Sequence, residues 1–124
     1  MKSVKKKILV IDDDEAVLGY LQKKIGYLYD LVLTTEPGLA LDFAVREEPD
    51  LILCDIDMPD IDGGEISRNF LKCEFTRSIP FAYLTGFVSP SEVRELRGNV
   101  GGRHGIAKAT PAPEMIQTIE QLLR

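Results

Sequence analysis

Residues 49–64 read PDLILCDIDMPDIDGG, and this stretch decides the fold class. Its apolar part, residues 51–54, is short, follows Pro49 and stops at an acid, which predicts a strand buried on both faces of a parallel sheet. Residues 55–64 are polar and contain a proline and two adjacent glycines, so they predict a loop. Asp55 therefore stands at the carboxyl end of a buried strand.

The rest of the chain repeats the same unit of a short apolar strand followed by a helix. Further strands are expected at residues 7–11 (KILVI), 31–35 (LVLTT), 79–84 (IPFAYL) and 106–107. Apolar residues at helical spacing predict a helix after each strand. The alternation predicts an α/β fold, with a five-stranded parallel sheet and helices on both faces.

Some of the connecting segments have recognisable ends or inner faces. The second helix is expected to place Leu39 inward, and a helix over residues 65–74 is expected to do the same with Leu71. Ser89 is expected to cap a short fourth helix that has a proline at its first position. Residues 98–105 contain four glycines and predict a loop.

Composition excludes several classes of protein. The chain has 124 residues, and its 15 basic and 20 acidic side chains give a net charge of −5, so it is a poor candidate for binding nucleic acid directly. No apolar run is long enough to span a membrane. The basic and apolar start ends in acids after Ile11, unlike a signal peptide. Two cysteines cannot build a disulfide framework, so we expect a cytoplasmic protein.

Acidic residues gather where predicted strands end. Asp12 and Asp13 follow the first strand and Asp55 follows the third, and the carboxyl ends of parallel strands meet at one rim of a sheet. Two carboxylates about 4 Å apart repel by about 4 kcal/mol at an effective dielectric constant of about 20. Oxygen ligands of this kind favour a hard cation, Mg²⁺ or Mn²⁺.

Two further strand ends supply groups that suit a phosphoryl ligand. Thr85 ends the fourth strand with a hydroxyl, and Lys108 ends the fifth with an ammonium group. A metal ion, a hydroxyl and an ammonium group can each stabilise phosphoryl oxygens. Asp55 could itself accept the phosphoryl group, since carboxylates form aspartyl phosphates.

Four segments together resemble the response-regulator receiver domain of two-component signalling. They are ILVIDDD (8–14), PDLILCDIDMPDIDGGE (49–65), IPFAYLTG (79–86) and GIAK (105–108). The resemblance covers residues 6–123 and is greatest to stand-alone, chemotaxis-type receivers. It implies a flavodoxin-like, doubly wound (βα)5 fold. It also implies a phosphorylation-controlled signalling switch that receives phosphate from a sensor histidine kinase or a histidine phosphotransfer protein.

The resemblance implies a role for each residue of the rim. Asp55 is expected to be the phosphoacceptor, Thr85 the switch hydroxyl, and Lys108 the partner of the acceptor and then of the phosphate. The expected Mg²⁺ ligands are the carboxylates of Asp12, Asp13 and Asp55 and the backbone carbonyl of Asp57. The downstream protein effector is not specified, and no direct contact with nucleic acid or membrane is expected.

Three features depart from the family pattern. Ala109 follows Lys108 where the family usually has a cis proline, and we expect a trans bond or strain there, because a cis bond without proline is unfavourable. Gly105 occupies the position of the usual aromatic switch residue, so the output surface is expected to differ. Asp57 and Phe87 stand at positions that flank the attacking water in the family, so the resemblance implies that they are candidate modulators of dephosphorylation.

Length and motif leave alternatives open. We expect residues 1–124 to form a single receiver domain with a core of about residues 6–123 and no output domain. It would then act through a partner, pass phosphate onward, or be a fragment of a longer protein. One alternative function is a pseudo-receiver that binds proteins without control by phosphorylation. The other is a phosphatase whose Asp55 and Asp57 form a DxD motif of the haloacid-dehalogenase type. The receiver itself is not expected to be an enzyme beyond catalysing its own phosphorylation and dephosphorylation.

Overall fold

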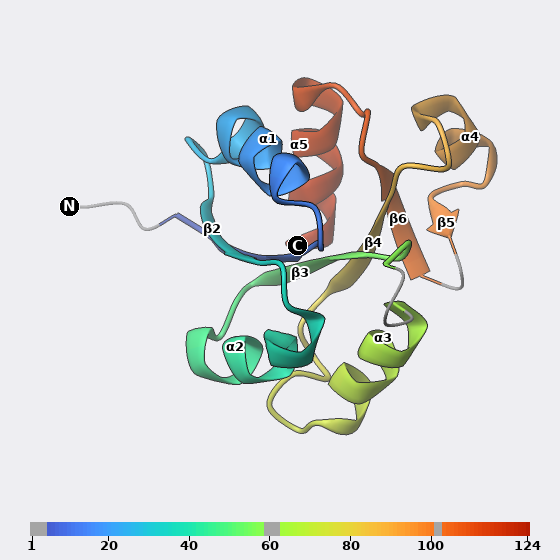
Figure 1. The fold of residues 1–124 in the computed structure, drawn as a ribbon. Coiled ribbons are helices and arrows are strands. Elements are labelled where there is room, and N and C mark those ends of the chain that lie inside the picture. The colour runs from blue at the N-terminus through green and yellow to red at the C-terminus, as the bar shows by residue number, and fades with distance from the viewer. Residues whose placement is uncertain (1–4, 59–62, 101–102) are drawn as a thin grey trace.

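The computed structural model describes residues 5–58, 63–100 and 103–124, which form an α/β fold around one sheet (Figure 1). Its strands are β1 (Lys7–Ile11), β2 (Asp30–Thr34), β3 (Leu51–Asp55), β4 (Phe81–Thr85), β5 (Asn99–Val100) and β6 (Arg103–Ala107). The order across the sheet is β2-β1-β3-β4-β6-β5, and all neighbours are parallel except β5 and β6. The predicted parallel α/β sheet is confirmed.

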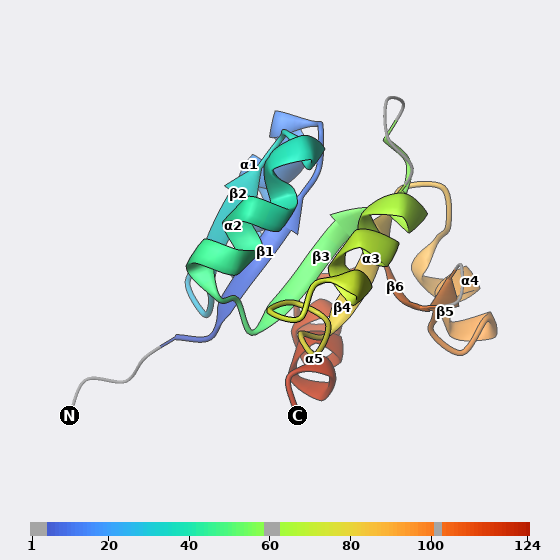
Figure 2. The same ribbon diagram turned by 90° about the horizontal axis from the view of Figure 1, so that it is seen from below.

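Helices cover both faces of the sheet. Figures 1 and 2 show α1 (Glu15–Ile25) and α5 (Ala112–Leu122) on one face, and α2 (Ala40–Glu47) and α3 (Gly63–Lys72) on the other. The short helix α4 (Pro90–Glu95) lies beside β6 near one edge, and a 3₁₀ turn, η1 (Pro37–Leu39), precedes α2. None of the helices in the described part of the chain has the length and apolarity needed to cross a bilayer.

The alternating side chains of the central strands form two separate cores. β3 and β4 are buried along their whole length, as expected for parallel strands covered on both faces. Leu51, Leu53 and Leu84 pack with α1 and α5, whereas Ile52 and Cys54 pack with α2 and α3. A change of register by one residue would exchange these faces, so the pattern fixes where each strand ends.

Local capping fixes where two helices begin. Asp14 caps α1, because its side chain accepts a hydrogen bond from the Ala16 N–H at 2.9 Å. The predicted cap of α4 is confirmed: Ser89 accepts from the Glu92 N–H, and the Glu92 side chain accepts in return from the Ser89 N–H. The loop after β4 is therefore held at its far end by a capping box.

Two predicted core residues and one predicted loop are wrong. Leu39 is 43% exposed because it lies in the 3₁₀ turn rather than in α2, and Leu71 is 51% exposed because it is one residue past the buried face that carries Phe70. The segment 98–105 is not a loop throughout. β5 lies within it, and β6 begins at Arg103, so the sheet has six strands instead of five.

Candidate functional site

The strand register brings the predicted residues to one rim of the sheet. Asp12 directly follows β1, Asp55 ends β3, Thr85 ends β4 and Lys108 follows β6. The pairing of Asp55 with Leu84 and of Thr85 with Ala107 sets these ends level with one another. The direction of strand addition reverses between β1 and β3: β2 is added on one side of β1, and β3, β4 and β6 are added on the other side. Ligands of open α/β sheets bind at such a point.

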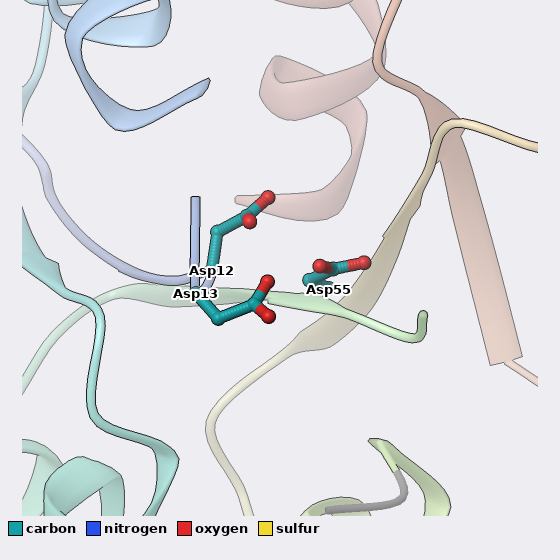
Figure 3. Close-up of side chains that lie close together, drawn as sticks. All are labelled: Asp12, Asp13 and Asp55. Carbon is teal, nitrogen blue, oxygen red and sulfur yellow. The ribbon is translucent and has the colours of Figure 1, made fainter. Parts of the chain in front are cut away.

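Three carboxyl groups meet at this reversal point. Figure 3 shows the side chains of Asp12, Asp13 and Asp55 close together at the ends of their strands. One carboxylate oxygen from each lies within 4.8 Å of the other two. Asp12 is fully buried, Asp55 is 2% exposed and Asp13 is exposed, so the group opens to solvent on one side. Three oxygen donors at this spacing could hold a metal ion, and hard cations prefer such ligands.

Lys108 compensates part of the buried negative charge. Its Nζ lies 2.8 Å from Oδ2 of Asp12 and 3.3 Å from Oδ2 of Asp55. Its backbone N–H donates to the carbonyl of Thr85 at 2.8 Å, which fixes the base of the side chain at the end of β4. Lys108 therefore bridges the two buried acids, Asp12 and Asp55.

Burial shifts the acid–base properties of this group. The pKa of Asp55 is raised from 3.8 to about 6, chiefly because burial disfavours the charged carboxylate. The hydrogen bond from the Asp57 N–H lowers this pKa, the charge of Asp12 raises it, and the contact with Lys108 lowers it. Burial lowers the pKa of Lys108, but its contacts with Asp12 and then Asp55 outweigh this and the net shift is upward. Burial, with Asp55 and Asp12 nearby, also raises the pKa of the Cys54 thiol, which stays protonated. The rim thus holds a partly compensated negative charge.

The Thr85 hydroxyl is hydrogen-bonded to its neighbours. Thr85, which is almost fully buried, donates from Oγ1 to Oδ2 of Asp57 at 3.1 Å, and the Gly86 N–H donates to the same oxygen at 3.2 Å. The Phe87 N–H donates to Oγ1 of Thr85 at 3.1 Å. Asp57 also donates its backbone N–H to Oδ1 of Asp55 at 2.9 Å. Asp57 therefore links the Asp55 carboxylate to the end of β4.

The two residues predicted as modulators lie in different surroundings. Asp57 is half-buried and points its carboxylate at Thr85 and Gly86. The side chain of Phe87 is 85% exposed, although its backbone is bonded to Thr85. Asp57 is thus built into the rim, whereas the Phe87 ring lies open to solvent.

The departures near β6 have structural explanations. Every peptide bond in the described residues is trans, including the one between Lys108 and Ala109, and Lys108 still reaches both acids. A Cβ atom at Gly105 would lie 2.3 Å from Cγ2 of Val100. Val100 of β5 therefore fills the space beside Gly105, and no larger residue fits there without movement of β5.

Sequence reasoning missed two contributors to this region. The N–H of Gly86 is a donor at the rim, and its signal was its place directly after Thr85 at a strand end. The packing of Val100 against Gly105 had no clear signal, because the residues of β5 and the start of β6 are mostly polar or glycine. The predicted loop at residues 59–62 lies outside the described residues.

The doubly wound α/β sheet carries its acids, a lysine and a threonine at the switch point, which is where proteins of this architecture bind their ligands. The chain matches the response regulator receiver domain family over residues 8–120. It is 30% identical to the polar-differentiation response regulator DivK of Brucella ovis, over 95% of this chain and 96% of that protein. The chain therefore belongs to the response regulator receiver domain family.

Solved structures have the same fold. The chemotaxis protein CheY4 of Vibrio cholerae superposes with a TM-score of 0.78 at 21% identity, covering 96% of this chain and 99% of that chain. The BeF3-activated N-terminal receiver domain of RstA from Klebsiella pneumoniae superposes with a TM-score of 0.77 at 27% identity, covering 96% and 99%. The protein is thus a receiver domain of two-component signalling, a family of regulators, with an acid group that could hold a metal ion.

Proposed function

We propose that the protein is a phosphorylation-controlled switch that accepts a phosphoryl group on Asp55. The donor is a phosphohistidine on a sensor histidine kinase or a histidine phosphotransfer protein. The observation that carries the proposal is the position of the Asp55 carboxylate: it is 2% exposed, grouped with Asp12 and Asp13, and 3.3 Å from the Nζ atom of Lys108. A buried acid with this surrounding is suited to reaction with a bound phosphate.

The contacts of the chain's own residues suit the transfer step. One Asp55 oxygen attacks phosphorus, the bond between phosphorus and the donor nitrogen breaks, and the nitrogen retains the electron pair. The Asp57 N–H holds Oδ1 of Asp55 in position, and Lys108 lies ready to pair with the incoming phosphoryl oxygens. Thr85 supplies the hydroxyl beside them.

Mg²⁺, or Mn²⁺, fits the donor set of the rim. The carboxylates of Asp12, Asp13 and Asp55 would hold it. The resemblance to the family adds the backbone carbonyl of Asp57. When bound, the cation supplies positive charge to the phosphoryl oxygens. A bound cation would offset the repulsion among the three acids, each of which places one carboxylate oxygen within 4.8 Å of the other two.

The output is a change of interaction surface. We propose that phosphorylation alters the face made by α4, β6 and α5, that a protein effector reads it, and that the protein works in the cytoplasm. Residues 1–124 would act as one receiver domain with a core of about residues 6–123. Asp57 and Phe87 would modulate dephosphorylation, since both are bonded to the region around Thr85.

Labelling tests the acceptor directly. Incubation with acetyl phosphate and Mg²⁺ should add one acid-labile phosphoryl group, detected by intact-protein mass spectrometry. Asp55→Asn should abolish the label. Asp30→Asn, which removes an exposed carboxylate at the opposite ends of the strands, should retain it. Undiminished labelling of Asp55→Asn would exclude Asp55 as the acceptor.

A melting experiment tests the metal site. Millimolar Mg²⁺ should raise the Tm of the wild-type protein, because the cation binds the folded state and relieves the repulsion among its acids. The rise should be smaller for Asp13→Asn, since Asp13 is the exposed member of the group. An equal Tm with and without Mg²⁺ in the wild-type protein would argue against the site.

A binding module without control by phosphorylation is the second candidate function. It is favoured by Val100, which fills the space beside Gly105 where the family usually has an aromatic switch residue. Absence of labelling in the wild-type protein would support it. The phosphatase alternative has less support, because the Asp57 carboxylate is bonded to Thr85 and Gly86 rather than directed at Asp55. Turnover of a phosphomonoester, lost in Asp57→Asn, would favour that alternative.

A further inference from the structure

The carboxylate of Asp57 holds two donors at the end of β4. Oδ2 accepts from the Thr85 hydroxyl at 3.1 Å and from the Gly86 N–H at 3.2 Å. A hydroxyl has one proton to donate, so Thr85 cannot donate to a second acceptor while this bond exists. The Phe87 N–H occupies a lone pair of the same hydroxyl oxygen. Thr85 is therefore committed in the unphosphorylated protein.

The same two donors lie next to the place where a phosphoryl group on Asp55 would stand. Asp55 is paired with Leu84 in the sheet, directly before Thr85. A Cβ atom at Gly86 would lie 3.8 Å from Cδ of Lys108, whose Nζ pairs with Asp55. The two donors and the Asp55 carboxylate thus lie at the ends of neighbouring strands, and the Asp57 carboxylate already uses the donors.

We propose that the Asp57 carboxylate competes with the phosphoryl group for the Thr85 hydroxyl and the Gly86 N–H, and that phosphorylation of Asp55 displaces it. This inference rests on the proposed function of Asp55. Like charges repel, so a phosphoryl group and the Asp57 carboxylate cannot share these donors at low energy. One anion replaces the other. In the unphosphorylated state, Asp57 is a positioning residue that holds the Thr85 hydroxyl and the Gly86 N–H.

In this exchange the side chain that moves is Asp57, so the conformational change does not depend on an aromatic switch residue. Gly105 has no side chain to follow Thr85, and Val100 fills the adjacent space. Asp57 can move instead, and it is followed by Met58, which is packed in the core formed with α2 and α3. Displacement of Asp57 would therefore transmit the change toward that face of the sheet as well as to the loop after β4.

The affinity for beryllofluoride with Mg²⁺, a phosphoryl analogue, tests the competition. Asp57→Asn keeps a side chain of the same shape without the charge, and Asp57→Ala removes the acceptor. Asp57→Ala should bind the analogue about ten-fold more tightly, the factor expected from one hydrogen bond to a charged group. Asp57→Asn should show a smaller gain, because its amide oxygen can still accept from the same donors without the charge. The matched control Asp30→Asn, at the opposite strand ends, should bind like the wild-type protein. Unchanged or weaker binding by both Asp57 variants would overturn the proposal.

Amide NMR of Gly86 separates displacement from a general effect on folding. In the free state the Gly86 signal should differ between wild type and Asp57→Ala, because only the wild type offers the carboxylate. In the beryllofluoride state the two signals should converge, because both donors then face the analogue. A wild-type Gly86 signal that does not move on binding would show that Asp57 stays in place and would overturn the proposal.

Calorimetry with Mg²⁺ alone distinguishes competition from an effect on the metal. The Mg²⁺ affinity of Asp57→Asn should not rise together with the analogue affinity, because the substitution removes a negative charge next to Asp55 and so cannot increase the attraction for the cation. A gain in Mg²⁺ affinity equal to the gain in analogue affinity would refute the competition. If the wild-type protein neither binds the analogue nor becomes labelled, the proposed function itself fails, which is a distinct outcome.

Discussion

Replacing Asp55 by asparagine is expected to stabilise the metal-free protein at neutral pH. Burial raises the pKa of Asp55 from 3.8 to about 6, so ionisation of this side chain is less favourable in the fold than in the unfolded chain. Each pKa unit corresponds to about 1.4 kcal/mol. At pH values well above 6, the ionised Asp55 therefore lowers the free energy of unfolding by about 3 kcal/mol. Asparagine resembles the protonated carboxyl and does not ionise, so it avoids this loss.

The sign of the pH dependence follows from proton binding. Between pH 3.8 and about 6 the folded protein binds the Asp55 proton and the unfolded chain does not. The stability due to this group is therefore complete below pH 3.8 and is lost as the pH rises through about 6. The advantage of Asp55→Asn over the wild type should shrink to about 1 kcal/mol near about pH 4.5. Saturation with Mg²⁺ should also reduce it, because the cation stabilises only the wild-type acid group.

Urea denaturation followed by far-ultraviolet circular dichroism measures this difference, since the chain contains no tryptophan. The free energies of unfolding of wild type, Asp55→Asn and Asp30→Asn should be compared at several pH values without metal. The exposed Asp30 control should stay within about 0.5 kcal/mol of wild type throughout. A difference for Asp55→Asn that is independent of pH, or a loss of stability at neutral pH, would refute the reasoning.

Three further substitutions have expected effects on the free energy of unfolding, measured in the same urea assay. Gly105→Ala should destabilise the protein by about 1–3 kcal/mol, because its Cβ would lie 2.3 Å from Val100. Adding Val100→Gly to this variant should recover much of the loss, and additive losses from the two substitutions would contradict the packing. Glu48→Gly should stabilise by up to about 1 kcal/mol, because Glu48 has a left-handed backbone with φ 49°, whereas a loss would show that its side chain contributes. Lys108→Met should cost about 3 kcal/mol, because the buried Asp12 loses its cation, and a neutral effect would mean that solvent compensates this charge.

The sequence predicted the part of the fold that depends on strong apolar periodicity. β3 and the acid that ends it were predictable because a fully apolar run must be buried on both faces. The common rim of Asp12, Asp55, Thr85 and Lys108 followed from parallel topology alone. The capping of α4 by Ser89 was predictable because capping depends on neighbouring residues rather than on tertiary contacts.

Other features depend on tertiary contacts that no local pattern expresses. Leu39 and Leu71 are apolar and near helical spacing, but a turn of 3₁₀ geometry and a shift of one residue expose them. The direction of the Asp57 carboxylate depends on where the end of β4 lies relative to the end of β3. β5 is short and has one apolar residue, Val100, because a strand at the lateral edge of a sheet is covered on only part of its surface.

The short hairpin of β5 and β6 also limits how copies of the chain can aggregate. An open sheet edge presents unpaired N–H and C=O groups that template the addition of a strand from another molecule. Here Asn99 and Val100 pair with His104 and Arg103, and the Gly105 N–H donates to the carbonyl of Gly98 at 2.8 Å. The first half of β6 is thus closed to an incoming strand, and the strand outside it is only two residues long. On this side of the molecule, edge-to-edge polymerisation is disfavoured by the backbone itself.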